Sequence, residues 1–353
     1  MNSIITKPDH EIYLDHAAMT PPLPCALEAY RNAPFGNPSS EHAAGNRARR
    51  ALEQARETIA ECLDCDIGEV YFVSTATEGA ALALNSLRRM EYDVIYSPLE
   101  HHAVSYNAWP YEKRERVAYA RMLGQNETGE LFSAPTLLKS YNRWLCDATA
   151  AVGHIPVSFR SLGCDYLLAD AIKFSGVPGA AFLIAKHGAP LSPMIRGGGQ
   201  ELGMRSGTEN LPAICAMAAA LEWQHEHGAE NTRYLEKLWR IMFNRLLEVT
   251  GCRVNTPLEK PHLPHILNVS FDGVEGRALV LFLSQMGVMV SAGAACSNGL
   301  NEPSHVLMAM FNDEARARSA IRISFSHENT EAEVHEAASK IGECVEYLRS
   351  LGV

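Results

Sequence analysis

The sequence contains no apolar stretch long enough to cross a lipid bilayer and no excess of positive charge. Its longest apolar run, near residues 211–221, is shorter than the about 20 residues that a membrane helix needs. The first ten residues lack the basic and apolar segments of a secretory signal. With 41 acidic against 31 basic side chains, the net charge of -10 opposes broad binding to nucleic acid or anionic membranes. We therefore expect a cytoplasmic protein without direct contact to a membrane or a nucleic acid.

Cysteine patterns typical of disulfide scaffolds and zinc sites are also missing. The nine cysteines lie at scattered positions, namely 25, 62, 65, 146, 164, 215, 252, 296 and 344. Cys62 and Cys65 form a lone C-x-x-C motif without the second pair or the histidines that a zinc site needs. Most of the others stand in apolar runs, as Cys146 and Cys215 do, which is typical of small core residues. We expect reduced thiols and no metal centre.

The composition is that of an ordinary globular protein. Hydrophobic residues make up 47% and charged residues 20% of the 353 residues, which excludes a disordered, collagen-like or coiled-coil chain. The middle of the sequence alternates short apolar runs with helical patterns, as in a mostly parallel sheet with crossover helices. The predicted strands cover residues 70–74, 93–97, 143–147, 165–169 and 181–185. Their continuous apolar character indicates that both faces of the sheet are covered.

The pattern changes near residue 231 to that of a smaller α+β domain. A long helical pattern precedes predicted strands and a helix at residues 266–271, 277–286, 288–291 and 321–325. Thr330 and Glu333 then form a capping box at the start of a last helix. We predict an N-terminal segment over residues 1–12 that joins the small domain, a large domain over 13–230 and a small C-terminal domain over 231–353.

Chemically reactive residues follow several of the predicted strands. Ligands of a parallel sheet bind outside the carboxyl ends of its strands, so these positions are candidate site residues. Residues 75–77 open a helical pattern, where hydroxyls and backbone N–H groups bind phosphate. His101, Asp147 and Lys173 follow three other strands. A phosphate site, an aromatic ring, a buried carboxylate and a lysine together are what pyridoxal 5′-phosphate (PLP) requires.

A series of short motifs runs through the chain in one order. They are Tyr13-Leu-Asp-His-Ala-Ala18, Gly36-Asn-Pro-Ser-Ser40, Ala76-Thr-Glu78, Glu100-His101, Asn126-Glu127, Asp147-Ala-Thr149, Lys173, Arg205-Ser-Gly-Thr208, Ser291-Ala-Gly-Ala-Ala-Cys296, Glu302-Pro-Ser304 and Ile321-Arg322. This series resembles the group I cysteine desulfurases, the NifS/IscS type, of the class V aminotransferase superfamily. The resemblance extends over nearly the whole chain.

The resemblance implies an α/β fold, that of the PLP-dependent transferases of fold type I. Such a protein has a large domain with a mostly parallel sheet of the seven-stranded type, flanked by helices, and a small α+β C-terminal domain. The resemblance also implies a homodimer that converts L-cysteine to L-alanine and passes the sulfur, as an enzyme-bound persulfide, to an acceptor protein. The sulfur would serve iron–sulfur cluster assembly, tRNA thiolation or DNA phosphorothioation.

The same resemblance implies a role for each site residue. Lys173 forms the Schiff base with PLP and moves protons, Asp147 pairs with the pyridinium nitrogen, and His101 stacks on the ring and assists proton transfer. The residues that contact the rest of the cofactor are Asn126 at the ring hydroxyl and Thr75, Ala76, Thr77 and, from the other subunit, Thr208 at the phosphate. Arg322 binds the substrate carboxylate through its planar fork of donors, with Asn126 and Asn37 on the substrate side.

Cys296 is the expected sulfur acceptor within the protein. Sulfur transfer needs a thiolate, and a free thiol with a pKa of about 8.5 is mostly protonated at neutral pH, so local activation is expected. Small residues surround Cys296, in contrast to the apolar runs around most other cysteines. A loop of such residues lets one sulfur reach both the cofactor and an acceptor.

Three positions depart from the family pattern. Ala150 stands where the family usually has Gln, and Asp170 and Ile172 stand where it has Ser and His ahead of the lysine. The usual side-chain donors to the phosphate and ring oxygen are thereby lost, and a carboxylate beside a phosphate is unfavourable unless it is paired. We expect weaker cofactor binding, or substitute donors such as Thr75. The segment between Glu127 and Asp147 is also a few residues shorter than the family pattern.

Two other functions are compatible with these residues. One is a selenocysteine lyase or another enzyme of the class V aminotransferase fold, which would not need the thiol of Cys296. The other is a catalytically weakened scaffold that binds a sulfur-transfer partner, which the lost phosphate donors favour. The joint presence of five residues favours the active desulfurase, namely Lys173, Asp147, His101, Cys296 and Arg322.

Overall fold

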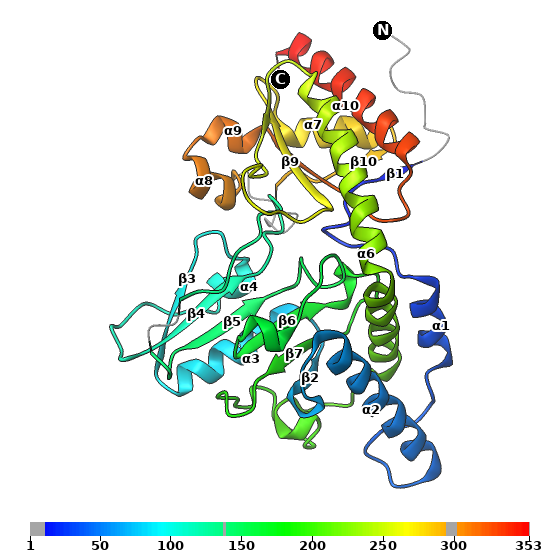
Figure 1. Cartoon of the computed structure of the whole chain (residues 1–353), viewed down its shortest axis with the longest axis vertical. Coiled ribbons are helices and arrows are strands. Elements are labelled where there is room, and N and C mark those ends of the chain that lie inside the picture. The colour runs from blue at the N-terminus through cyan, green and yellow to red at the C-terminus, as the bar shows by residue number, and fades with distance from the viewer. Residues whose placement is uncertain (1–10, 137–138, 294–301, 353) are drawn as a thin grey trace. The chain divides into compact units, whose positions relative to one another are not determined.

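The computed structural model describes residues 11–136, 139–293 and 302–352, and their contacts divide the chain into two compact units (Figure 1). The large unit consists of residues 20–124 and 132–228. The small unit contains the described parts of residues 1–19, 125–131 and 229–353. No helix of the described residues is long and apolar enough to cross a membrane. The predicted domain limits of 1–12, 13–230 and 231–353 stay a prediction.

The large unit is built on one mixed sheet with the strand order β2-β7-β6-β5-β4-β3. The strands are β2 (Val70–Val73), β3 (Tyr92–Tyr96), β4 (Arg116–Met122), β5 (Arg143–Asp147), β6 (Tyr166–Asp170) and β7 (Ala181–Ala185). Neighbours from β3 to β6 are parallel, and β7 is antiparallel to both β6 and β2. This arrangement confirms the α/β class and the mostly parallel sheet.

The sheet differs from the sequence prediction in the number of its strands and in the strand β4, which was not predicted. It has six strands in the described residues, whereas seven were expected. The parallel neighbours β3 and β4 are joined by residues 97–115, whose only helix is the short α4 (His102–Ser105), and this connection contains no further strand. The strand β4 was missed because it begins with Arg116 and contains Arg121, so its buried residues alternate instead of forming a continuous apolar run.

Helices pack their apolar residues against this sheet. The large unit contains α1 (Pro24–Asn32), α2 (Ala43–Leu63), η1 (Ile67–Glu69), α3 (Ala76–Arg89), α4, α5 (Phe159–Leu162), η2 (Ala171–Lys173), η3 (Glu201–Gly203) and the first part of α6 (Leu211–Leu247). Leu84 and Leu87 of α3 share a buried core with Val94, Leu145 and Leu183 of the sheet. This packing fixes α3 across the sheet, with its N-terminus directly after β2.

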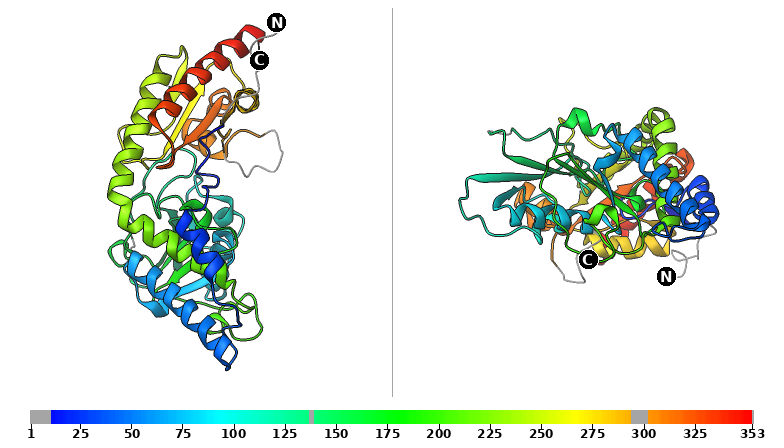
Figure 2. Two further views of the ribbon diagram at one scale, coloured as in Figure 1. Left: turned by 90° about the vertical axis from the view of Figure 1, so that its right-hand side faces the viewer. Right: turned by 90° about the horizontal axis from the view of Figure 1, so that it is seen from below.

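The small unit has its own sheet and its own apolar core. The antiparallel order is β11 (Ala320–Ser324), β9 (Ile266–Phe271) and β8 (Cys252–Val254), and β1 (Ile12–Tyr13) pairs in parallel with β10 (Val288–Met289). Its helices are α7 (Gly276–Gln285), α8 (His305–Phe311), α9 (Glu314–Arg318), α10 (Glu331–Leu351) and the last part of α6. The helices α6 and α10 lie beside the strands of the small sheet (Figure 2), and their side chains share one core with those of β9 and β11. The predicted capping box of Thr330 and Glu333 is confirmed.

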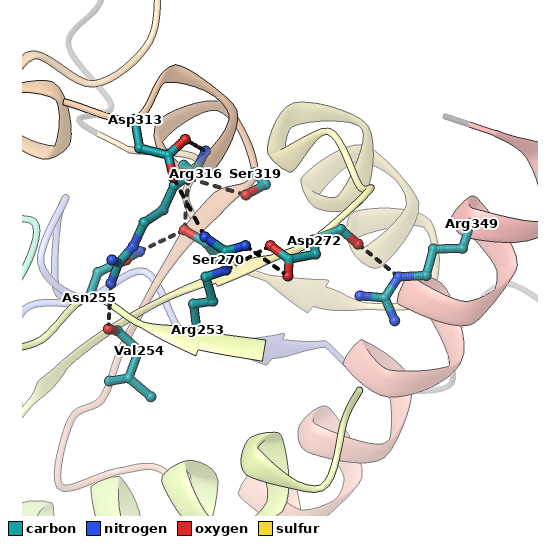
Figure 3. A network of polar contacts seen from close by, with 9 residues as sticks. All are labelled: Arg253, Val254, Asn255, Ser270, Asp272, Asp313, Arg316, Ser319 and Arg349. Carbon is teal, nitrogen blue, oxygen red and sulfur yellow. Dashed lines mark hydrogen bonds and ion pairs between the residues drawn. The ribbon is translucent and has the colours of Figure 1, made fainter. Parts of the chain in front are cut away.

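A network of polar contacts holds α9 against the small sheet (Figure 3). Asp313 caps α9 by accepting a hydrogen bond from the Arg316 N–H at 3.0 Å. The Arg316 guanidinium donates to Asn255 Oδ1 at 2.7 Å. Arg253 forms ion pairs with Asp272 at 2.9 Å and Asp313 at 3.5 Å. Because these pairs are half-exposed, they orient α9 more than they stabilise the fold.

A buried ion pair in the large unit gives a test of stability. Glu201 of η3 accepts from both terminal nitrogens of Arg56, at 2.8 and 2.9 Å, and from the Phe72 N–H at 2.8 Å. Replacing Glu201 with Ala leaves the Arg56 charge buried without this partner, so we expect a loss of about 3–5 kcal/mol in unfolding free energy. Urea unfolding measures the effect. Glu53→Ala, which removes an exposed partner of Arg56, should cost at most about 1 kcal/mol, and equal losses would contradict the prediction.

Candidate active site

Reactive side chains gather at the carboxyl edge of the large sheet. Asp147 is the last residue of β5, Asp170 is the last residue of β6, and Lys173 ends η2 three residues later. His101 follows β3 as the N-cap of α4, and its Nδ1 accepts a hydrogen bond from the Ala103 N–H at 3.0 Å. Since β3 to β6 are parallel, these strand ends share one edge, where α/β proteins bind ligands.

Three carboxyl groups at this edge are buried. Glu100, Asp147 and Asp170 have exposed fractions of 1%, 8% and 7%. Burial raises the pKa of Glu100 to about 8, and the charge of Asp147 adds to the effect. Burial also raises the pKa of Asp170, against the opposing effects of two backbone N–H donors and of the Lys173 charge. This edge of the sheet therefore places several acidic groups and a lysine in a poorly hydrated environment.

The first turn of α3 forms the second part of the site. Thr75 is the N-cap, and its hydroxyl accepts from the Glu78 N–H at 3.2 Å. The Ala76 N–H donates to Asp170 Oδ2 at 2.9 Å, so a carboxylate of the chain already binds the helix N-terminus. Thr75 and Thr77 are exposed. Arg205 pairs with Glu78 at 2.8 Å and so anchors the segment that leads to the exposed Thr208.

The small unit places Arg322 in a buried polar cluster. Arg322 lies in β11 and is 2% exposed. Its Nη2 donates to Asp15 Oδ1 at 2.8 Å and its Nη1 to the Asn126 carbonyl at 2.8 Å. Its Nε is buried without a hydrogen bond among the described residues. The Arg322 backbone N–H donates to the Ser291 carbonyl at 2.7 Å, so the segment that leads to Cys296 starts beside this arginine.

The predicted site residues thus fall into groups. The large unit brings together His101, Asp147, Lys173 and residues 75–77, with Thr208 on the anchored segment. Asn37 lies in the loop before α2, where its Oδ1 accepts from the Ser39 N–H at 2.9 Å. Arg322 and Asn126 meet in the small unit. Cys296 lies outside the described residues.

Sequence reasoning missed two partners of these residues. Asp15 pairs with Arg322 across 307 positions of sequence, and only its place in the motif of residues 13–18 marked it. Asp170 was expected to disturb a phosphate site, but its bond to the Ala76 N–H follows from strand order, which sequence patterns do not contain. The sequence marked Glu100 only as part of the motif Glu100-His101, although burial raises the pKa of its carboxyl to about 8.

Comparisons with known proteins agree with this arrangement. The aminotransferase class-V family model matches residues 12–131 and 112–336. The chain belongs to this family. It is 35% identical to the cysteine desulfurase of Cereibacter sphaeroides, over 96% of this chain and 97% of that protein. It is 34% identical to the putative cysteine desulfurase IscS 1 of Bacillus subtilis (strain 168), over 96% of this chain and 99% of that protein.

Solved structures show the same fold. A NifS-like protein matches with a TM-score of 0.87 and 31% identity, over 96% of this chain and 100% of that chain. The structure of SspA in complex with cysteine matches with a TM-score of 0.72 and 25% identity, over 90% of this chain and 99% of that chain. These findings confirm the family resemblance and the fold expected from the sequence motifs.

The class-V family is PLP-dependent, and the donor set at the sheet edge fits that cofactor. Asp147 supplies a buried carboxylate, held by the Thr149 N–H at 3.0 Å, at the end of the strand next to β6, which Lys173 follows. The Thr149 hydroxyl is buried and has no hydrogen-bond partner within the described ranges, so a ligand atom would satisfy it. The start of α3 supplies N–H groups and the Thr75 hydroxyl for a phosphate, with Asp170 as an opposing carboxylate bound to the Ala76 N–H.

The raised pKa of Glu100 makes the stability of the large unit depend on pH. Because the folded-state pKa is about 8 instead of 4.5, the folded state favours the neutral carboxyl, and stability falls as pH rises from 4.5 to about 8. Glu100→Gln removes this titration and keeps an oxygen for the Met122 N–H. As pH rises across this range, we expect the melting temperature of the wild type to fall relative to that of the variant. Glu115→Gln, at an exposed site, is the control, and parallel pH curves for Glu100→Gln and wild type would refute the prediction.

Proposed function

We propose that the protein is a PLP-dependent cysteine desulfurase. It converts L-cysteine to L-alanine and carries the sulfur as a persulfide on Cys296 until an acceptor protein takes it. The observation that carries the proposal is the joint position of Asp147 and Lys173 at one edge of the parallel sheet, beside the N-terminus of α3. The relatives named as cysteine desulfurases, which the chain matches over 96% of its length, support it.

Most of the residues that this proposal assigns to the cofactor lie in the large unit. When bound, PLP supplies an electron sink that makes the α-hydrogen of the amino acid acidic. Asp147 would keep a proton on the ring nitrogen, His101 would stack on the ring, and Lys173 would hold the cofactor and move a proton at the substrate α-carbon. The groups assigned to the remaining contacts are Asn126 at the ring hydroxyl and Thr75, Ala76, Thr77 and Thr208 at the phosphate.

The small unit binds the substrate carboxylate. Arg322 is a fixed donor because Asp15 and the Asn126 carbonyl hold its two terminal nitrogens at 2.8 Å each. Asp15 is therefore a positioning residue, since it acts through the arginine. Asn126 and Asn37 are assigned to the substrate side. A preoriented guanidinium loses little side-chain freedom when a carboxylate binds.

Cys296 is the thiol suited to sulfur transfer. Burial raises the pKa of Cys62 and Cys65 to about 12 and that of Cys252 to about 11, so these thiols stay protonated. The Cys296 thiolate attacks the sulfur of the substrate, a sulfur–sulfur bond forms, and the substrate's carbon–sulfur bond breaks. A proton completes the methyl group of alanine. The sum is one thiol and cysteine giving one persulfide and alanine, with no other oxidant or reductant.

The partners follow from the same proposal. We assign a homodimer, in which Thr208 reaches the cofactor phosphate of the other subunit, and a cytoplasmic location. The sulfur acceptor is a protein of iron–sulfur cluster assembly, tRNA thiolation or DNA phosphorothioation.

One observation favours a second candidate function, a catalytically weakened scaffold for a sulfur-transfer partner. The Asp170 carboxylate already binds the Ala76 N–H, where a cofactor phosphate would bind.

Sulfide release from L-cysteine tests the proposed activity. With added PLP and a thiol reductant, wild-type protein should release sulfide, and Cys296→Ser should lose turnover while its visible cofactor absorbance persists. Cys252→Ser is the control, because this half-buried thiol with a pKa raised to about 11 has no role in the reaction. Full turnover by Cys296→Ser would point to a lyase that needs no protein thiol. Absence of turnover and absorbance in wild type would favour the scaffold.

The Arg322 assignment predicts a defect in substrate binding. Arg322→Lys replaces a planar fork by a single ammonium group, so we expect the KM for L-cysteine to rise about tenfold, with a smaller change in kcat. Arg253→Lys, in the exposed network of Figure 3, is the matched control and should leave KM unchanged. Steady-state kinetics measure both variants. A fall in kcat at constant KM would contradict a carboxylate-binding role.

A further inference from the structure

Asp170 joins the end of β6 to the start of α3. Its Oδ2 accepts from the Ala76 N–H at 2.9 Å, and its Oδ1 lies 3.4 Å from the Ile172 N–H. The residue is 7% exposed, so water does not compete strongly for these bonds. Ala76 is the first residue of α3, a helix of 14 residues whose N-terminal N–H groups attract one anion. In this structure the anion that they attract belongs to the chain itself.

The groups around Asp170 do not neutralise it fully. Lys173, from η2, favours its charged form, while Asp147, from β5, opposes it. In the first turn of α3, Glu78 is itself paired with Arg205 at 2.8 Å, so this arginine is already engaged. Burial outweighs the favourable contacts and raises the pKa of Asp170. A second anion at the same N-terminus would therefore meet a buried carboxylate at close range and would favour its protonation.

We propose that Asp170 is an internal competitor for the cofactor phosphate, so that phosphate binding at α3 favours protonation of this carboxylate. The inference rests on the proposed function, because it concerns the PLP phosphate. It goes beyond that function by making occupancy of the site dependent on proton uptake by one residue. The cofactor then binds more weakly as pH rises, and removal of the Asp170 charge strengthens binding.

The isosteric variant Asp170→Asn tests the role of the charge. Its amide oxygen still accepts from the Ala76 N–H, so the start of α3 keeps its cap. The matched control is Asp165→Asn, directly before the first residue of the same strand, because Asp165 also accepts from a backbone N–H, that of Trp144 at 2.9 Å. Both variants remove one partly or fully buried carboxylate, but only one of them faces α3.

Pyridoxine 5′-phosphate is the probe, because it has no aldehyde and its binding does not depend on reaction with Lys173. Isothermal titration at about pH 8 should show about tenfold tighter binding to Asp170→Asn than to wild type, and no change for Asp165→Asn. Unphosphorylated pyridoxine should not distinguish Asp170→Asn from wild type. Titration in two buffers of different ionisation enthalpy should show more proton uptake for wild type than for Asp170→Asn.

The outcomes separate this inference from the proposed function. Equal affinity and equal proton uptake in wild type and Asp170→Asn would make Asp170 a structural cap only and overturn the inference, while the desulfurase proposal would stand. Absence of binding to both proteins would overturn both proposals. If Asp170→Asn does not fold, wild type alone decides, since binding without proton uptake contradicts protonation of Asp170.

Discussion

The site depends on one constraint, the parallel direction of β3 to β6, which brings their carboxyl ends to a single edge. Residues far apart in sequence, such as His101 and Lys173, reach the same region because each follows one of these strands. The same edge is buried by helices packed on the sheet, so charges there are poorly hydrated. Proximity and poor hydration together raise the carboxyl pKa values. Groups with shifted pKa values are suited to acid–base chemistry.

The small unit contains both a buried arginine and a half-exposed network of charged residues. In the small unit, Arg322 is nearly inaccessible, and two oxygen atoms fix its terminal nitrogens. Its orientation is thus set before any ligand binds. The contacts of Arg253 and Asp272 lie instead at the half-exposed edge of the sheet, where solvent screens them. A buried, oriented cation suits carboxylate recognition, whereas the exposed network serves mainly to place α9.

Much of the fold could be predicted because the buried strands of this sheet have continuous apolar sequences. The predicted strands at 143–147 and 181–185 coincide with β5 and β7. The prediction failed at β4, whose terminal arginines break the run, and in the number of strands. Site residues at strand ends were found from their chemical type. The contact of Asp170 with Ala76 was not, because it joins residues 94 positions apart through the order of strands in the sheet.

Asp147 and Asp170 show that the position of a carboxylate at a shared edge decides its effect. Both end neighbouring parallel strands, and both are buried. Asp147 is bonded to the Thr149 N–H and suits a cationic ring nitrogen, which its charge stabilises. Asp170 is bonded to a helix N-terminus, where an incoming phosphate has the same sign of charge. One carboxylate thus suits and the other opposes binding of the same molecule, so in this proposal the charge state of Asp170 controls how much of the site is filled.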